Sequence, residues 1–275
     1  MTYSTLMVHM SLDGDSEGLL AIATSLAERG GYGVIGVAAR QPLQIIYGAG
    51  GATELVELDR QAIQEALNAA ERRFRAAMIG RVANIEWRGE MTAWPLAEFV
   101  AHKVRAADLI LTAPDVGVGF ANSDTRMSVG DLVMRAGRPV LIVPGGAKTL
   151  NFDHALVAWK DTREARRATA DALPLLKFAG DVTVVEISDP DFVDEANKRL
   201  DDVAAWLASH GIAAKAEVVA SNGHEPRKLE ELAHAKKAGL MIAGAYGRAR
   251  LLEWVFGGVT SDLLLHPGRC TLVSH

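Results

Sequence analysis

A stretch near the end of the printed sequence combines glycines and hydroxyls in a pattern suited to binding an anion. It follows a short apolar run at residues 240–243, which has the length of a buried strand, and it precedes residues 262–265, which favour a helix. Glycine lets the backbone adopt positive φ or approach a ligand closely, and a helix N-terminus presents unpaired N–H groups. A strand, a glycine loop and a helix in this order predict a phosphate site. Its candidate ligand-binding residues are Gly244, Gly247, Gly257, Gly258, Thr260 and Ser261.

No residue beside this loop is predicted to be catalytic. Hydrolysis of a bound nucleotide needs a positioned base or water as well as a phosphate cradle. Glu253 lies within the loop and Asp262 just beyond it, where carboxylates are also common for structural reasons. The chain has no G-x4-G-K-[ST] loop and no H-E-x-x-H pair. We therefore expect nucleotide binding without an assigned catalytic residue, and a slow ATPase stays open as an alternative.

The composition argues against two classes of partner and against a metal centre. The 275 residues carry a formal net charge of −5, with a pI of about 5.9, so we expect neither nucleic acid nor an anionic membrane surface as a partner. The single cysteine, Cys270, excludes an intrachain disulfide, and we predict no metal site. The first residues lack the basic and apolar regions of a signal peptide, and we expect a cytoplasmic protein.

Strand-like and helix-like segments alternate along the chain. In the first part, strands are expected at residues 6–10, 33–39, 81–87, 108–113 and 139–143, and helices at residues 17–29, 55–78, 94–104 and 129–135. In the second part, strands are expected at residues 155–159, 182–187, 213–219 and 240–243 and at the end of the chain, with helices at residues 164–178, 191–210 and 225–237. This alternation predicts an α/β fold with a parallel sheet covered by helices.

The second part of the chain repeats the first. A spacing of 131 residues separates Leu109 from Leu240, Pro95 from Pro226 and Leu132 from Leu263, whereas a spacing of 148 separates Asp13 from Asp161 and Val34 from Val182. The difference of 17 residues places an insertion in the first part, between its second strand and its third helix. We therefore predict two tandem doubly wound domains at residues 1–146 and 151–275, each with a five-stranded parallel sheet. Only the second has the glycines, because Ala113 stands opposite Gly244.

The glycine spacing carries a family resemblance. Gly244, Gly247 and Gly257 form the pattern G-x2-G-x9-G after the fourth strand of a five-stranded α/β unit. The chain thereby resembles the nucleotide-binding universal stress proteins, and its two units resemble their tandem class. That family places Ser or Thr directly after the last glycine, where this chain has Gly258. The resemblance implies ATP or another adenine nucleotide, with or without Mg²⁺, bound in the second domain.

The resemblance also implies contacts from the first two strands of the second domain. In the family, an Asp just after the first strand lies near the adenine or ribose, and the second strand contacts the base through its backbone. Asp161 and Val184 are the corresponding candidates. An alignment on Trp159 would instead put the family's Asp position on Lys160, and Asp161 would then only cap the following helix.

Two interpretations of the function follow. The resemblance implies a stress-response sensor or regulator, in which the nucleotide alters the contact between the two halves of an intramolecular pseudo-dimer or between the chains of a homodimer. The alternative is a structural or interaction module of the same fold, in which the glycines only end a strand and begin a helix.

Overall fold

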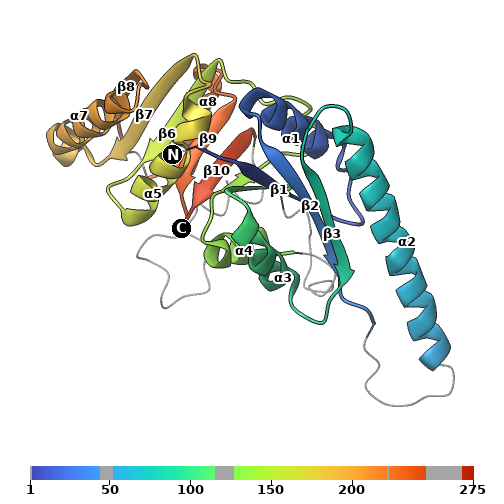
Figure 1. The fold of residues 1–275 in the computed structure, drawn as a ribbon. Coiled ribbons are helices and arrows are strands. Elements are labelled where there is room, and N and C mark those ends of the chain that lie inside the picture. The colour runs from blue at the N-terminus through green and yellow to red at the C-terminus, as the bar shows by residue number, and fades with distance from the viewer. Residues whose placement is uncertain (1, 44–51, 115–126, 222, 246–267) are drawn as a thin grey trace.

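The chain folds around one continuous sheet of ten strands with helices on both faces (Figure 1). The fold was obtained as a computed structural model that describes residues 2–43, 52–114, 127–221, 223–245 and 268–275. Strands and helices alternate as the sequence predicts, and the α/β class is confirmed.

The helices and strands of the first half have the following bounds. In chain order they are β1 (Thr5–His9), α1 (Glu17–Gly30), β2 (Gly33–Arg40), α2 (Ala52–Met78), β3 (Ile85–Met91), α3 (Leu96–Lys103), the 3-10 turn η1 (Val104–Ala106), β4 (Leu109–Thr112), α4 (Val129–Ala136) and β5 (Val140–Ile142).

The second half has the same order of strands. Its elements are β6 (His154–Trp159), α5 (Arg163–Asp171), α6 (Leu173–Leu176), β7 (Asp181–Ser188), the 3-10 turn η3 (Pro190–Phe192), α7 (Val193–Ser209), β8 (Ala214–Ala220), α8 (Glu225–Ala235), β9 (Leu240–Gly244) and β10 (Cys270–Ser274).

Two parallel five-stranded units meet in the middle of the sheet. The strand order is β3-β2-β1-β4-β5-β10-β9-β6-β7-β8, and the pairing of β5 with β10 is antiparallel whereas all the other described pairings are parallel. Leu141 of β5 lies opposite Leu272 of β10, which is the residue 131 positions later. The halves therefore run in opposite directions, and the carboxyl ends of their strands lie at opposite edges of the sheet.

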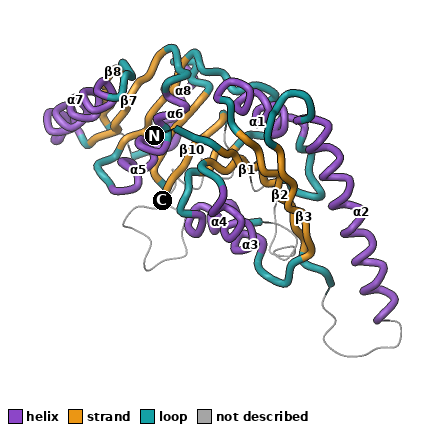
Figure 2. Tube along the Cα trace, viewed as in Figure 1, coloured by secondary structure: helices purple, strands orange, loops and turns teal. Residues whose placement is uncertain are grey.

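The helices divide between the two faces of the sheet as in a doubly wound fold (Figure 2). The apolar cluster that includes residues of α1, α2, α5, α6 and α7 lies on one face, and the clusters that include α3 with α4 and α8 lie on the other. In each half, the helices that connect the first three strands cover one face of the sheet, and the described helices after the third strand cover the other. The direction of the crossover connections therefore changes between β1 and β4 in the first half and between β6 and β9 in the second. Such a change of direction is where open α/β sheets bind ligands, at the carboxyl ends of the strands.

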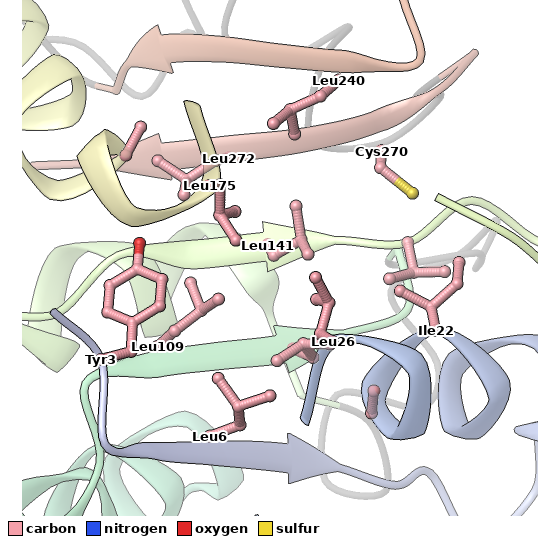
Figure 3. Close-up of a cluster of buried hydrophobic side chains, with 14 of the residues drawn as sticks. Tyr3, Leu6, Ile22, Leu26, Leu109, Leu141, Leu175, Leu240, Cys270 and Leu272 are labelled. Atoms are coloured by element: carbon pink, nitrogen blue, oxygen red, sulfur yellow. The ribbon is translucent and has the colours of Figure 1, made fainter. Parts of the chain in front are cut away.

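The two halves share a hydrophobic core. Figure 3 shows Leu109 and Leu141 of the first half packing beside Leu272 and Leu175 of the second. Cys270 is buried in the same cluster, and burial raises the pKa of its thiol to about 12, so the thiol stays protonated at neutral pH. A core that crosses the junction favours cooperative unfolding of both halves.

The structure corrects three details of the predicted elements. The strand expected at residues 81–87 begins at Ile85, because the N–H groups of Arg81 and Val82 both donate to the backbone oxygen of Met78 in a turn after α2. The helix expected at residues 164–178 is divided into α5 and α6, with Pro174 in the first turn of α6. The insertion itself lies where the repeat predicts it, between the second strand and the third helix, and α2 there has 27 residues against 17 in α7.

The third correction concerns the register of the repeat. His9 of β1 pairs with Val37 as Ala158 of β6 pairs with Val185, so the first strands of the two halves are related by 149 residues rather than 148. The neighbouring strands give the same offset, because Val8 pairs with Leu111 as Val157 pairs with Ile242. In this register Asp161 corresponds to Leu12 and not to Asp13.

A hydrogen bond across the junction gives a testable stability effect. The Tyr3 hydroxyl donates to the backbone oxygen of Asp171, at 2.5 Å. We expect Tyr3→Phe to lower the free energy of unfolding by about 1 kcal/mol, because a partly buried hydrogen bond is lost. Urea unfolding measures the change, and Tyr32→Phe is the matched control, since Tyr32 packs edge-on against Tyr3 and its hydroxyl makes no hydrogen bond within the described residues. Equal stabilities of the two variants would contradict the prediction.

Candidate functional site

The carboxyl ends of β6, β7 and β9 form the edge of the second half at which the sequence places a nucleotide site. Gly244 is the last residue of β9, Asp161 follows β6, and Val184 lies within β7. The predicted ligand residues Gly247, Gly257, Gly258, Thr260 and Ser261 lie outside the described residues, as do Glu253 and Asp262.

Gly244 has a packing role that the sequence does not reveal. A Cβ atom at this position would lie 2.5 Å from the backbone nitrogen of Ala165 and 2.7 Å from the carbonyl carbon of Glu164, both at the start of α5. Only three residues connect β6 to α5, whereas seven connect β1 to α1. The short connection draws the start of α5 against the end of β9, and only a residue without Cβ fits there.

Ala245 fixes the point from which the loop departs. Its N–H donates to the backbone oxygen of Ser274 at 2.8 Å, and Nδ1 of His275 lies 3.2 Å from its carbonyl oxygen. Its side chain is fully buried in the cluster of α3 and α4, which belong to the first half. The glycine loop therefore begins at the boundary between the halves, held by the end of β10.

Glu164 places a negative charge at the N-terminus of α5. Its side chain is only 11% exposed. Burial acts to raise the pKa of this carboxyl, but hydrogen bonds from its own backbone N–H and from the Thr162 side chain, together with the charge of Arg163, hold the pKa below its usual value. An ionised carboxylate at this helix start repels a second anion. A phosphate at this edge would therefore have to lie against the loop after β9 and not against α5.

Asp161 lies at the predicted edge but is directed toward the start of α5. Its side chain is 57% exposed, and its Oδ1 accepts a hydrogen bond from Nη1 of Arg166 at 2.6 Å. The cap of α5 is Thr162, whose hydroxyl accepts from the backbone N–H of Ala165. Because Oδ1 already accepts from Arg166, a ribose hydroxyl at this position would donate to Oδ2 of Asp161.

Val184 lies inside the sheet, four residues before the end of β7. Its side chain is fully buried in the shared core. The backbone oxygen of Ser188 accepts from Ser221 on the β8 side, and the polar backbone groups of alternate residues in a strand point the same way, so those of Val184 also face β8. Ile187 points to the β6 side, and the β6 pairing ends at Glu186, opposite Trp159. At the edge, the backbone carbonyl directed toward β6 is that of Ile187.

The side chains at the switch point differ sharply between the halves. In the first half, Nδ1 of His9 lies 3.0 Å from Oγ1 of Thr112, and both residues are buried. The Thr112 hydroxyl donates to the carbonyl oxygen of Ala113, which makes Nδ1 of His9 the donor to Oγ1. Burial lowers the pKa of His9 to about 4, so the ring is neutral at pH 7. The corresponding residues of the second half are Ala158 and Ala243.

A motif of the first half that could suggest a hydrolase has a structural explanation. Residues 14–18 match G-x-S-x-G, which marks a nucleophile in hydrolases when it forms a sharp turn between a strand and a helix. Ser16 is instead the N-cap residue of α1, with φ −116° and ψ 6°, and it stands seven residues after the end of β1. The strained elbow that exposes a nucleophile is absent at Ser16. Among the described residues, no group of three or more His, Cys, Asp and Glu side chains is arranged to hold a metal ion.

Comparison with known proteins gives matches among solved structures. No protein-family model and no curated protein matches the sequence. A universal stress protein from Archaeoglobus fulgidus superposes with a TM-score of 0.74 at 14% identity, over 98% of this chain and 97% of its own. The chain has the universal stress protein fold in tandem. Two Pseudomonas aeruginosa proteins superpose with TM-scores of 0.58. One is a putative universal stress protein at 16% identity, over 99% of this chain and 93% of its own, and the other is described as functionally unknown, at 14% identity over 99% and 92%.

The universal stress protein fold accounts for the strand order of each half and for the change of crossover direction at β1 and β6. Within the described residues, no helix combines the length and the apolar composition needed to cross a bilayer.

Proposed function

We propose that the second half binds ATP or another adenine nucleotide, with or without Mg²⁺, and that the chain acts in the cytoplasm as a nucleotide-dependent sensor or regulator of a stress response. One observation carries the proposal. The switch point of the second half is lined at its strand ends by Ala158 and Ala243 and continues into the glycine loop, whereas that of the first half is filled by His9 and Thr112.

The base would lie beyond the ends of β6 and β7, with the phosphates over the loop after β9. There we assign the second-strand backbone contact to the carbonyl of Ile187 instead of Val184, because the Ile187 carbonyl points to the open side of β7. Asp161 would offer its second oxygen to the ribose. The phosphates would take backbone N–H groups of the loop, whose candidate residues are Gly244, Gly247, Gly257 and Gly258, with Thr260 and Ser261 as hydroxyl donors.

The residues of this edge can bind and orient a nucleotide. A charge-assisted hydrogen bond contributes about 1.5–3 kcal/mol, and three or four such bonds, less the cost of ordering the loop, correspond to a micromolar ligand. The negative charge of Glu164 would direct the phosphates away from α5 and toward the loop. The Ala245 N–H donates to the backbone oxygen of Ser274, and the Ala245 side chain packs among first-half residues. Ordering of the loop would therefore change the contact between the halves. This arrangement is the intramolecular pseudo-dimer through which we propose that the signal passes.

Calorimetric titration of the purified chain with ATP and MgCl₂ tests the proposal. We expect one binding site per chain, and we expect Gly247→Val to weaken binding by about ten-fold or more, because a side chain would stand where the phosphates approach. Gly145→Ala is the matched control, since a Cβ there meets nothing within 4 Å. A chain that carries no nucleotide on purification and shows no heat with ATP would contradict the proposal, as would equal affinities of Gly247→Val and the control.

The packing of Gly244 gives the alternative function its support. A glycine that is required by the approach of α5 has a role without any ligand, as expected of a purely structural or interaction module. The same titration separates the two, because a module of this kind binds no ATP. Mg²⁺-dependent release of phosphate that is lost in Gly247→Val would show in addition that the chain is a slow ATPase.

A further inference from the structure

The strand ends of the two halves have the same backbone arrangement but opposite side-chain character. His9 and Ala158 occupy equivalent positions, because each pairs with the equivalent valine of the next strand. Thr112 and Ala243 are equivalent in the same way, since Thr112 pairs with Ile142 and Ala243 with Val273. One polar pair thus stands where the other half has two methyl groups.

The polar pair of the first half joins the carboxyl ends of the neighbouring strands β1 and β4. Nδ1 of His9 lies 3.0 Å from Oγ1 of Thr112 on the neighbouring strand, and His9 is only 8% exposed. In a doubly wound sheet the gap between two such strand ends is the place where the two crossover directions separate and a ligand enters. In the first half, protein side chains already occupy it.

A second contact closes the neighbouring gap between β1 and β2. The guanidinium of Arg40, at the end of β2, forms an ion pair with Asp13 in the connection after β1. The residue of the second half equivalent to Arg40 is Ser188, whose hydroxyl donates to the carbonyl of Asp189 at 3.2 Å. Asp161 is meanwhile paired with Arg166 on α5. Among the described residues of the second half, no side-chain pair crosses either gap at the carboxyl edge as these two pairs do.

We propose that these positions decide which half takes the ligand: Ala158 and Ala243 are specificity-determining residues that admit the adenine nucleotide to the second half, and His9 with Thr112 excludes it from the first. This inference rests on the proposed function. Its physical basis is volume, because an imidazole and a branched side chain at these strand ends are larger than the two methyl groups that stand at the same positions in the second half. Exclusion from the first half therefore has two causes, the missing glycines and the filled strand ends.

The double variant Ala158→His/Ala243→Thr tests the inference by giving the second half the strand ends of the first. We expect its affinity for ATP, measured by calorimetry, to fall by about ten-fold or more, with the glycine loop unchanged. Circular dichroism and thermal unfolding report whether the variant is folded, and the hydrogen bond seen in the first half supports this combination of residues. A folded double variant that binds ATP within about two-fold of the unsubstituted chain would overturn the inference while the proposed function stands. Absence of ATP binding by the unsubstituted chain would contradict the proposed function and the inference together.

The reciprocal variant decides the matter if the first double variant does not fold. His9→Ala/Thr112→Ala opens the strand ends of the first half and leaves the second half untouched. Adenosine is the probe, because the first half has no glycine loop for phosphates. We expect calorimetry to show two adenosine sites per chain in this variant and one in the unsubstituted chain. A stoichiometry that remains at one would overturn the inference.

Discussion

Acidification from about pH 7 to about pH 4 should lower the free energy of unfolding by about 3 kcal/mol through His9 alone. His9 is buried beside Thr112, and burial lowers the pKa of its imidazole from 6.5 to about 4. Below pH 6.5 the unfolded chain therefore binds a proton at this residue that the folded chain does not bind until about pH 4. Stability is unaffected by His9 above pH 6.5 and is lost progressively as the pH falls between these two values.

Urea unfolding of His9→Asn and of the unsubstituted chain, each at about pH 7.5 and about pH 4.5, measures this contribution. Asparagine does not titrate, and its side-chain amide can still donate to Oγ1 of Thr112. The acid-dependent loss should be smaller in His9→Asn by most of the predicted amount. His102→Asn is the matched control, because it makes the same change of residue at an exposed position on α3. The same acid dependence in all three proteins would refute the contribution of His9.

Most of the architecture could be predicted because it follows from periodicity along the chain. The alternation of apolar runs and helical segments predicts the succession of strands and helices along the chain, and the repeat of Leu109 at Leu240 predicts two similar units. Neither pattern predicts the antiparallel pairing of β5 with β10 that joins the units into one sheet. The register predicted for β1 is wrong by one residue, since the seven-residue connection after β1 is longer than the three-residue connection after β6 and hides the shift. Counting residues through loops of unequal length gives unreliable equivalences, whereas the pairing of β1 with β2 and with β4 determines which residues of β1 and β6 are equivalent.

The sequence predicts which loops and strand ends form the candidate site, but not the contacts that its residues make. The role of Gly244 depends on the approach of α5, which is close in space but about 80 residues away in the sequence. The direction of the Val184 backbone depends on the strands beside it, and no pattern in a single strand reveals it. The contrast between His9 with Thr112 and the two alanines could have been read from the repeat once the register was known. Its meaning required the hydrogen bond across residues 103 positions apart.

The two halves differ in how the side chains at their strand ends are packed. In the first half, the buried side chains of His9 and Thr112 are hydrogen-bonded to each other, and Arg40 forms an ion pair with the half-exposed Asp13. In the second half, Ala158 and Ala243 stand at the positions of His9 and Thr112, and their methyl groups cannot make such a hydrogen bond. Binding sites are commonly less stable than an optimised core, because the groups that a ligand will contact cannot also be used by the protein.

Gly244→Ala should lower the free energy of unfolding by about 2 to 3 kcal/mol in the absence of any ligand. The new Cβ would stand 2.5 Å from the backbone nitrogen of Ala165, and backbone atoms cannot rotate away as a flexible side chain would. Either α5 moves outward, which loosens its packing on the sheet, or β9 shifts against β10, where Gly244 pairs with Ser274. Urea unfolding without nucleotide measures the change, since bound ligand would add its own stabilisation.

Gly145→Ala provides the comparison for this effect, because it adds the same methyl group where no atom lies within 4 Å and should change stability by less than about 0.5 kcal/mol. If Gly244→Ala is as stable as Gly145→Ala, the close approach of α5 does not require a glycine. The absence of a side chain at Gly244 would then make room for a ligand, and Gly244→Ala should weaken ATP binding without destabilising the chain. If Gly244→Ala is destabilised as expected, any loss of binding in that variant follows from the displaced α5. Gly247→Val then remains the variant that separates phosphate binding from the fold.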